Sequence, residues 1–310
     1  MESTPFPITF SNSVSRARDD NSPIVALESA VITHGLPYPE NLNLAHDLEQ
    51  DVSAELATPA TIALLDGKIH VGLTPAQLER IATATDALKV SRRDFGVVLA
   101  RGVPGGTTVA GTLHAAQRAG IRVFATGGIG GVHRNAPFDI SADLDELGRT
   151  PLVAVCSGAK SILDLPATLE VLETRGVMVL GYQTDEFPAF FSRSSGLQVP
   201  FRSDNPREIA AIARAHWNAG IDAAVLVVNP PPEETALPFD EIEAVIQNAL
   251  LEAEKEGIHG AATTPFLLAR VNQLSGGRSL QANLGLLRSN ARLAAQIAVE
   301  LARSKSIRLV

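Results

Sequence analysis

The chain has 310 residues, and its 26 Lys and Arg residues against 34 Asp and Glu residues give a formal net charge of −8. With 45% hydrophobic and 19% charged residues the composition is that of a folded globular protein, and the acidic balance argues against an extended nucleic-acid-binding face. The single cysteine, Cys156, excludes an intrachain disulfide framework and a cysteine-rich zinc site, and it fits a reducing cytoplasm.

The first residues lack a basic start followed by an apolar core, so we predict no signal peptide. The apolar runs are also too short to span a bilayer, so we expect a soluble, cytoplasmic protein. We find no internal repeat or linker, and we assign residues 1–22 to an N-terminal tail and residues 23–310 to one domain.

From residue 23 onward, short apolar runs alternate with amphipathic segments. The predicted strands are residues 24–32, 62–65, 96–99, 121–125, 152–156, 177–182 and 223–228. Asp66-Gly67 predicts a two-residue hairpin turn after residues 62–65. Thr74 to Gln77 has the pattern of a capping box that starts a helix. Further helices are predicted at residues 107–119, 161–175, 239–256, 265–274 and 280–303.

Strand–helix alternation of this kind predicts an α/β fold, a three-layer α/β/α sandwich around a mostly parallel central sheet. In such sheets ligands bind outside the carboxyl ends of the strands. Candidate site residues are therefore sought directly after each predicted strand.

Glu28 and His34 belong to the first predicted strand and the turn after it. A carboxylate in an apolar strand is costly unless it is paired or used, so Glu28 is either a cap for backbone amides or a functional acid. His34 is interpreted as a turn residue.

The segment from Lys89 to Asp94 is the densest basic cluster in this acidic chain. It is either a solvated helix end or a binding site for phosphate. Two glycine-rich stretches, residues 102–108 and 126–131, could bring backbone N–H groups close to an anion. Neither has the pattern of a dinucleotide-binding loop.

Asp139, Ser141 and Asp143 follow one another at a spacing of two. In a strand they share a side, and in a helix Asp139 and Asp143 share a face. Both conformations bring two carboxylates together, which suits a hard divalent cation, although a solvated acidic turn would have the same pattern.

Lys160 follows the predicted strand 152–156 and is predicted to open a helix. The sequence Ser157 to Ser161 fails the P-loop pattern, because Ala159 precedes the lysine. Lys160 is either a lysine that forms an imine with a carbonyl substrate or a phosphate-binding lysine. Cys156 beside it is predicted to be a core residue.

Several long segments together carry a specific resemblance to a known family. They are residues 25–29 (VALES), 89–94 (KVSRRD), 123–134 (VFATGGIGGVHR), 138–144 (FDISADL), 158–164 (GAKSILD) and 264–271 (TPFLLARV). From about residue 23 to residue 302 the chain resembles the pseudouridine-5′-phosphate glycosidase family, also called pseudouridylate synthases or indigoidine-synthase-A-like proteins.

The resemblance implies an α/β/α homotrimer that reversibly cleaves the C–C glycosidic bond of pseudouridine 5′-phosphate to uracil and ribose 5-phosphate, with a divalent metal, usually Mn²⁺. It implies that Glu28 is the proton donor, Lys160 the covalent nucleophile and Asp139 the metal ligand. It further implies that the substrate contacts are Lys89, Val109, Ser141, Ala142, Asp143 and, on the uracil side, Asn283.

The implied chemistry explains why two carboxylates would not suffice. The base leaves through carbon, so the scissile atom offers no lone pair to protonate. By analogy with the family, Glu28 protonates the ring oxygen, and Lys160 adds at C1′ and forms an imine as the C–C bond breaks. Two alternatives remain: a lysine-imine aldolase for a phosphosugar, and a non-catalytic regulator that binds a sugar phosphate.

Overall fold

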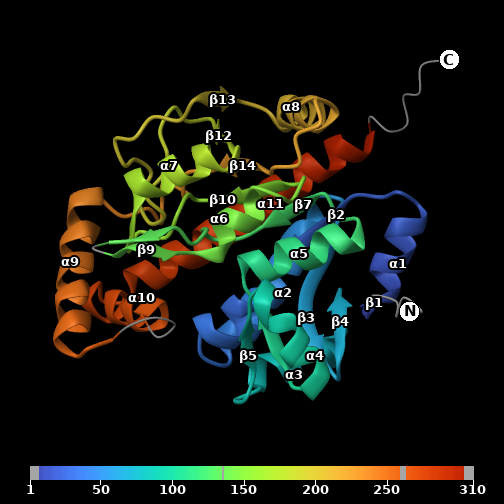
Figure 1. The fold of residues 1–310 in the computed structure, drawn as a ribbon, viewed down its shortest axis with the longest axis horizontal. Helices are drawn as coiled ribbons and strands as arrows, with labels where there is room; N and C mark the ends of the chain where they lie inside the picture. Colours follow the sequence, from blue (N-terminus) through green and yellow to red (C-terminus); the bar gives the residue numbers. More distant parts are fainter. Residues whose placement is uncertain (1–6, 135, 259–262, 304–310) are drawn as a thin grey trace.

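A computed structural model describes residues 7–134, 136–258 and 263–303, and Figure 1 shows its ribbon. The main sheet runs in the order β1-β4-β3-β2-β7-β10-β14-β12-β13, with β6 and β5 attached beside β3. Its strands are β1 (Ile8–Phe10), β2 (Ile24–Leu27), β3 (Thr58–Leu65), β4 (Lys68–Val71), β5 (Leu88–Val90), β6 (Gly105–Thr107), β7 (Val123–Ala125), β10 (Val153–Cys156), β12 (Met178–Tyr182), β13 (Phe201–Ser203) and β14 (Val225–Val228).

The centre of this sheet is parallel from β3 through β2, β7, β10, β14 and β12 to β13. Antiparallel pairing occurs where β3 meets β4 and β6. A second, smaller sheet has the order β11-β8-β9 and consists of β11 (Leu163–Asp164), β8 (Val132–His133) and β9 (Ala136–Ile140). The central strands are fully buried apolar runs, as expected for a sheet covered on both faces.

Helices surround the sheet in two groups. In the first, α11 packs on β2, β7 and β10 and also contacts α2 and α8; in the second, α5 packs on β2 and β3 beside α6. The helices are α1 (Asn12–Asp19), α2 (Glu40–Ala54), α3 (Pro75–Thr83), α4 (Phe95–Arg101), α5 (Val109–Ala119), α6 (Ala142–Leu147), α7 (Leu165–Thr174), α8 (Pro206–Asn218), α9 (Phe239–Lys255), α10 (Thr263–Leu274) and α11 (Arg278–Arg303), with short turns η1 (Val31–Gly35) and η2 (Arg92–Asp94). The predicted three-layer α/β/α architecture is confirmed.

The hairpin turn and the helix cap predicted from the sequence are also confirmed. Asp66 and Gly67 both have positive φ, 52° and 71°, as a type I′ hairpin turn requires. The Thr74 hydroxyl accepts from the backbone N–H of Gln77, whose side chain in turn accepts from the backbone N–H of Thr74. Within the described residues, no helix is both long and apolar enough to cross a membrane.

The strand predicted at residues 96–99 is wrong, because this segment lies in helix α4. Its four apolar residues resemble a short strand, but Phe95 and Val98 are buried while Gly96 and Val97 are exposed, which is a helical period. Gly102 then ends the helix in the left-handed conformation, with φ 65°.

Three other predicted boundaries shift. Strand β2 ends at Leu27, and a π-helical turn replaces the remainder of the predicted strand. Helix α5 begins at Val109 because residues 105–107 pair as strand β6. Residues 161–175 contain β11 before helix α7 starts, so the segment after Lys160 does not open a helix.

Part of the predicted N-terminal tail belongs to the fold. Strand β1 pairs in parallel with β4, and helix α1 buries Val14 and Ala17. Residues 8–19 are therefore an integral edge of the sheet, and the tail assignment is wrong for them.

Candidate active site

Three neighbouring parallel strands end at one edge of the sheet and bring their following residues together. Glu28 follows β2, Thr126 follows β7, and residues 157–160 follow β10. Because β2 pairs with β7 and β7 pairs with β10, these three segments are adjacent although they are far apart in the sequence. The expected ligand-binding edge therefore carries Glu28 and Lys160 side by side.

Glu28 is a partly buried carboxyl that accepts a short hydrogen bond from the Thr126 hydroxyl. Burial raises the pKa of Glu28, while the charge of Lys160, the Thr126 hydrogen bond and the charge of Lys89 oppose that rise. The raised pKa keeps the carboxyl protonated to higher pH than an ordinary glutamate, as a proton donor requires. The capping alternative finds no support, since the described partner of Glu28 is a side chain.

Lys160 stands on a loop that is fixed by backbone contacts. Its N–H donates to the carbonyl of Ile129 at 3.0 Å, and the N–H of Ile129 donates to the carbonyl of Gly158 at 3.1 Å. Gly158 has φ +84°, and a side chain there would collide with the carbonyl of Pro188. The predicted helix N-terminus is absent here, so a glycine-dependent turn holds Lys160 near Glu28.

Lys89 reaches the same site from strand β5. The N–H of Thr108 donates to the carbonyl of Val90 at 2.9 Å, which places β5 next to the start of α5. Desolvation by the surrounding protein lowers the pKa of Lys89, as does the charge of Lys160, while Asp143 and Glu28 oppose this. Lys89, Lys160, Glu28 and Asp143 are thus close enough to act on one another electrostatically.

The remainder of the predicted basic cluster points elsewhere. Arg92 pairs with the buried carboxylate of Glu146 at 3.2 Å, and the exposed Arg93 lies 3.6 Å from its neighbour Asp94. Lys89 is therefore the member of this cluster that the structure directs to the site. His34, the predicted turn residue, is exposed in η1, and its Nδ1 lies 2.6 Å from the Thr33 hydroxyl.

Asp143 joins two walls of the site. Its buried carboxylate accepts from the N–H of Ala110 at 2.9 Å, in the first turn of α5, and from the N–H of Gly130 at 2.8 Å, in the glycine-rich loop. A side chain on Gly130 would collide with Ser141 and with this carboxylate. Asp143 therefore links the start of α5 to the glycine-rich loop through two hydrogen bonds.

The other predicted substrate contacts lie around Asp143. Val109 opens α5 with its side chain buried, so what it can present to a ligand is its backbone N–H. Ser141 caps α6 by accepting from the N–H of Asp143, and Ala142 beside it is exposed. The described contacts leave their role toward a substrate as a prediction.

The regular spacing that predicts a carboxylate pair from Asp139 and Asp143 is interrupted in the fold. The chain changes from strand β9 to helix α6 at Ser141, so neither the strand period nor the helix period relates the two residues. Asp139 is exposed, whereas both oxygens of Asp143 are occupied by backbone N–H groups. Among the described residues, no three His, Cys, Asp or Glu side chains cluster as a metal cage.

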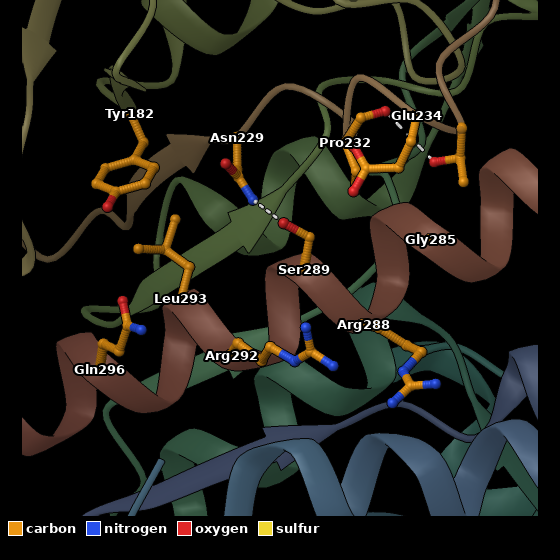
Figure 2. Close-up of a pocket in the computed structure, with 11 residues that line it drawn as sticks. Tyr182, Asn229, Pro232, Glu234, Gly285, Arg288, Ser289, Arg292, Leu293 and Gln296 are labelled. Atoms are coloured by element: carbon orange, nitrogen blue, oxygen red, sulfur yellow. Dashed lines mark hydrogen bonds between the residues drawn. The ribbon is translucent and has the colours of Figure 1, made fainter. Parts of the chain in front are cut away.

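A cavity beside α11 is lined by none of the predicted site residues. It measures about 470 Å³. Figure 2 shows α11, with Ser289 and Arg292, along one side of the cavity, and Tyr182 and Asn229 on another. Asn283 lies on α11 outside this lining, partly buried, and its uracil-side role stays a prediction.

Two residues of the site region are not among those predicted from the sequence. Thr126 begins a glycine-rich stretch, and its hydroxyl contacts Glu28. Asn290 is fully buried and bonded to the loops after β7 and β10. A buried asparagine on an apolar helix face is the available signal, since such an amide needs partners.

Cys156 is fully buried and burial raises the pKa of its thiol to about 12, which confirms it as a core residue.

The chain is similar to known proteins over nearly its whole length. Pseudouridine-5′-phosphate glycosidases from Geobacillus kaustophilus and Petrotoga mobilis are 54% and 50% identical to this chain, over 95% and 97% of it and 98% of each relative. The solved prealnumycin C-glycosynthase AlnA, in complex with ribulose 5-phosphate, superposes with a TM-score of 0.91 at 40% identity, covering 98% of this chain and all of that one.

An indigoidine synthase A (IdgA)-like protein from Thermotoga maritima superposes with a TM-score of 0.89 at 38% identity, covering 98% of this chain and 99% of that one. Residues 13–300 match the family described as Indigoidine synthase A like protein. The match begins inside helix α1, which agrees with the place of this helix in the fold. The chain therefore belongs to the Indigoidine synthase A like protein family.

Proposed function

We propose that this protein is an enzyme that reversibly cleaves the C–C glycosidic bond of pseudouridine 5′-phosphate, giving uracil and ribose 5-phosphate. The names of relatives at about half identity over nearly the whole chain support this activity. The observation that carries it is the juxtaposition of Glu28, a carboxyl with a raised pKa, and Lys160, whose charge acts on it. An acid beside an amine is the pair that this reaction needs.

In the proposed reaction Glu28 donates a proton to the ring oxygen of the ribose as the bond from that oxygen to C1′ breaks. The lone pair of Lys160 Nζ forms a bond to C1′, and the nitrogen loses a proton. The lysine nitrogen then supplies electrons to form an iminium as the bond from C1′ to the uracil carbon breaks, and that carbon takes up a proton. One water hydrolyses the imine, which releases ribose 5-phosphate and restores Lys160.

The phosphate group is proposed to bind at Lys89 and at the first turn of α5. Lys89 supplies a positive charge beside Lys160, and a helix start offers backbone N–H groups without partners inside the helix. Asp143 fixes this helix start against the glycine-rich loop. Ser141, Ala142 and Asn283 complete the proposed substrate contacts.

A divalent cation, Mn²⁺ in the proposal, would be held by Asp139. A hard cation that keeps most of its waters can be bound through a single carboxylate together with substrate oxygens, and Asp139 is an exposed carboxylate without a described hydrogen-bond partner. When bound, the ion would compensate the negative charge of the substrate. Each oxygen of Asp143 accepts one backbone N–H, so the proposal assigns Asp143 to the contact between α5 and the glycine-rich loop and Asp139 to the cation.

The homotrimer is likewise a proposal. Exposed apolar side chains on β9 and α9 support a contact between copies of the chain: Phe138 is 98% exposed, and Ile140, Phe239 and Leu251 are 39–63% exposed. Light scattering on the purified protein measures the oligomeric state directly. Cytoplasmic location is proposed on the reduced, buried Cys156.

The test of function is turnover of pseudouridine 5′-phosphate with Mn²⁺, monitored by release of uracil, and the reverse reaction from uracil and ribose 5-phosphate. Free pseudouridine is the matched control substrate, and we expect it to react far more slowly than pseudouridine 5′-phosphate because it lacks the phosphate. Ketose phosphates test the aldolase alternative. Product in neither direction, or cleavage of a ketose phosphate instead, would contradict the proposal.

A further inference from the structure

Asn290 is a fully buried polar residue on α11, the long helix that crosses β2, β7 and β10 (Figure 1). Its Nδ2 donates to the carbonyl of Thr126 at 2.9 Å and to the hydroxyl of Ser157 at 3.1 Å. One side chain therefore bonds the loop after β7 and the loop after β10. No role in the reaction described above uses it.

The orientation of the Asn290 amide is determined by its partners. The carbonyls of Thr126 and Gly127 can only accept hydrogen bonds, so the nitrogen of the amide must face them. On the opposite side, Asn229 Nδ2 donates to Asn290 Oδ1 at 3.0 Å. The same Asn229 amide donates to the Ser289 hydroxyl at 3.1 Å, as Figure 2 shows.

Of the two loops that Asn290 joins, the loop after β7 contacts the proposed acid and the loop after β10 carries the proposed nucleophile. The Thr126 hydroxyl contacts Glu28, and Ser157 leads into the turn that holds Lys160. Four of the six residues 126–131 are glycines, and Gly158 forms the turn before Lys160, so the loops have little stiffness of their own. Direct contacts, such as Ser157 N–H to the Gly127 carbonyl at 2.8 Å, join the loops to each other, and Asn290 adds the hydrogen bonds that attach both of them to α11.

We infer that Asn290 is a positioning residue, which sets the separation of Glu28 and Lys160 by fixing the ends of the β7 and β10 loops on α11. This inference rests on the proposed function. A displacement of about 1 Å between reacting groups can reduce a rate by about 10²-fold, so the bond network acts on turnover rather than on binding. The phosphate contacts at Lys89 and α5 lie on other elements and do not depend on it.

The decisive variant is Asn290→Asp, which keeps the shape but places an oxygen against the Thr126 carbonyl. We expect kcat to fall about 10- to 100-fold and KM to change less than about 3-fold. The Thr126 hydrogen bond lowers the pKa of Glu28, so loosening it raises that pKa and moves the alkaline limb of kcat to higher pH. Hydrogen exchange without substrate should become faster at residues 126–131 and 157–161.

Ser289→Ala is the matched control, because it removes a neighbouring hydrogen bond to Asn229 and leaves the contacts to Thr126 and Ser157 intact. We expect parental kcat, pH profile and exchange for it. If Asn290→Asp does not fold, Ser157→Ala tests the same link and should lower kcat about 3- to 10-fold with the same direction of pH shift.

Parental kcat and exchange in folded Asn290→Asp, or in Ser157→Ala when Asn290→Asp does not fold, would overturn the inference, as would a rise in KM alone. A parent protein without turnover would contradict the proposed function, and the exchange measurement would still decide the role of Asn290.

Discussion

The loops after β2, β7 and β10 and the small sheet β11-β8-β9 carry predicted site residues under opposite physical conditions. In the loops, Glu28 is partly buried and bonded to Thr126, and the backbone of Lys160 is bonded to Ile129. In the small sheet, Asp139 is exposed, and its neighbour Phe138 is 98% exposed. In the first region the functional groups have partners within the chain. In the second, Asp139 and Phe138 are exposed and have no described partner in the chain.

This difference separates two kinds of functional residue. The pKa of Glu28 is set by burial and by nearby charges of the same chain, and burial raises it. A residue such as Asp139 acquires its property from a cation or substrate that binds to it. Substitutions in the first region should therefore lower turnover. Substitutions in the second should remove the dependence of activity on the bound cation.

The largest expected effect is that of Lys160→Arg. A guanidinium stays protonated and cannot attack C1′, so we expect turnover to fall about 10³-fold or more. Steady-state release of uracil measures it, with Lys68→Arg, an exposed lysine on β4, as the control that should keep parental turnover. Turnover within about tenfold of the parent would assign the nucleophile elsewhere.

Glu28→Gln should reduce kcat about 10²- to 10⁴-fold, because the amide keeps the shape but supplies no proton. The raised pKa of Glu28 means that its protonated fraction, and with it kcat, falls as pH rises through that value. The alkaline limb of the kcat profile should therefore disappear from the residual activity of the variant.

Glu49→Gln is a close control for Glu28→Gln. Glu49 on α2 is also a carboxyl whose pKa is raised by burial, and it accepts from the Thr61 hydroxyl at 2.6 Å. It lies outside the site, so kcat and its pH limb should stay parental. An equal loss in both variants would show that burial of a carboxyl, rather than proton donation, explains the effect.

Asp139→Asn should make activity insensitive to added Mn²⁺ and lower it about 10- to 100-fold. Titration of the chelator-treated variant with Mn²⁺, followed by turnover, measures both. Asp145→Asn is the control, since that exposed carboxylate pairs with Arg175 and should respond to Mn²⁺ like the parent. A parental response of Asp139→Asn would remove Asp139 from the metal site.

Lys89→Ala should have the smallest effect, a rise in KM of about tenfold with kcat nearly unchanged. A phosphate contact made equally in ground and transition states contributes uniform binding. Arg93→Ala is the matched control from the same basic cluster, because Arg93 is exposed and lies beside Asp94 instead of the site. A fall in kcat alone for Lys89→Ala would place Lys89 in the chemistry.

The same contrast governs what the sequence could predict. The central strands are recognisable because several continuous apolar runs such as residues 152–156 alternate with helical patterns. Thr74 marks the start of α3 with a capping hydroxyl, and Gly67 marks the hairpin turn because glycine tolerates a positive φ. Residues 96–99 were misassigned because four apolar residues fit either period. The bonds of Asn290 and Asp143 could not be predicted, since each joins segments that only the folded chain brings together.

The central claim is that Lys160 forms a covalent imine with the sugar phosphate, and borohydride trapping tests it most directly. The protein is incubated with ribose 5-phosphate, reduced and digested, and mass spectrometry locates the adduct. We predict one sugar-phosphate adduct on the peptide containing residues 158–163, absent in Lys160→Arg and still present in Lys89→Ala at high ligand concentration. An adduct on Lys89, or an adduct that persists in Lys160→Arg, would contradict the account.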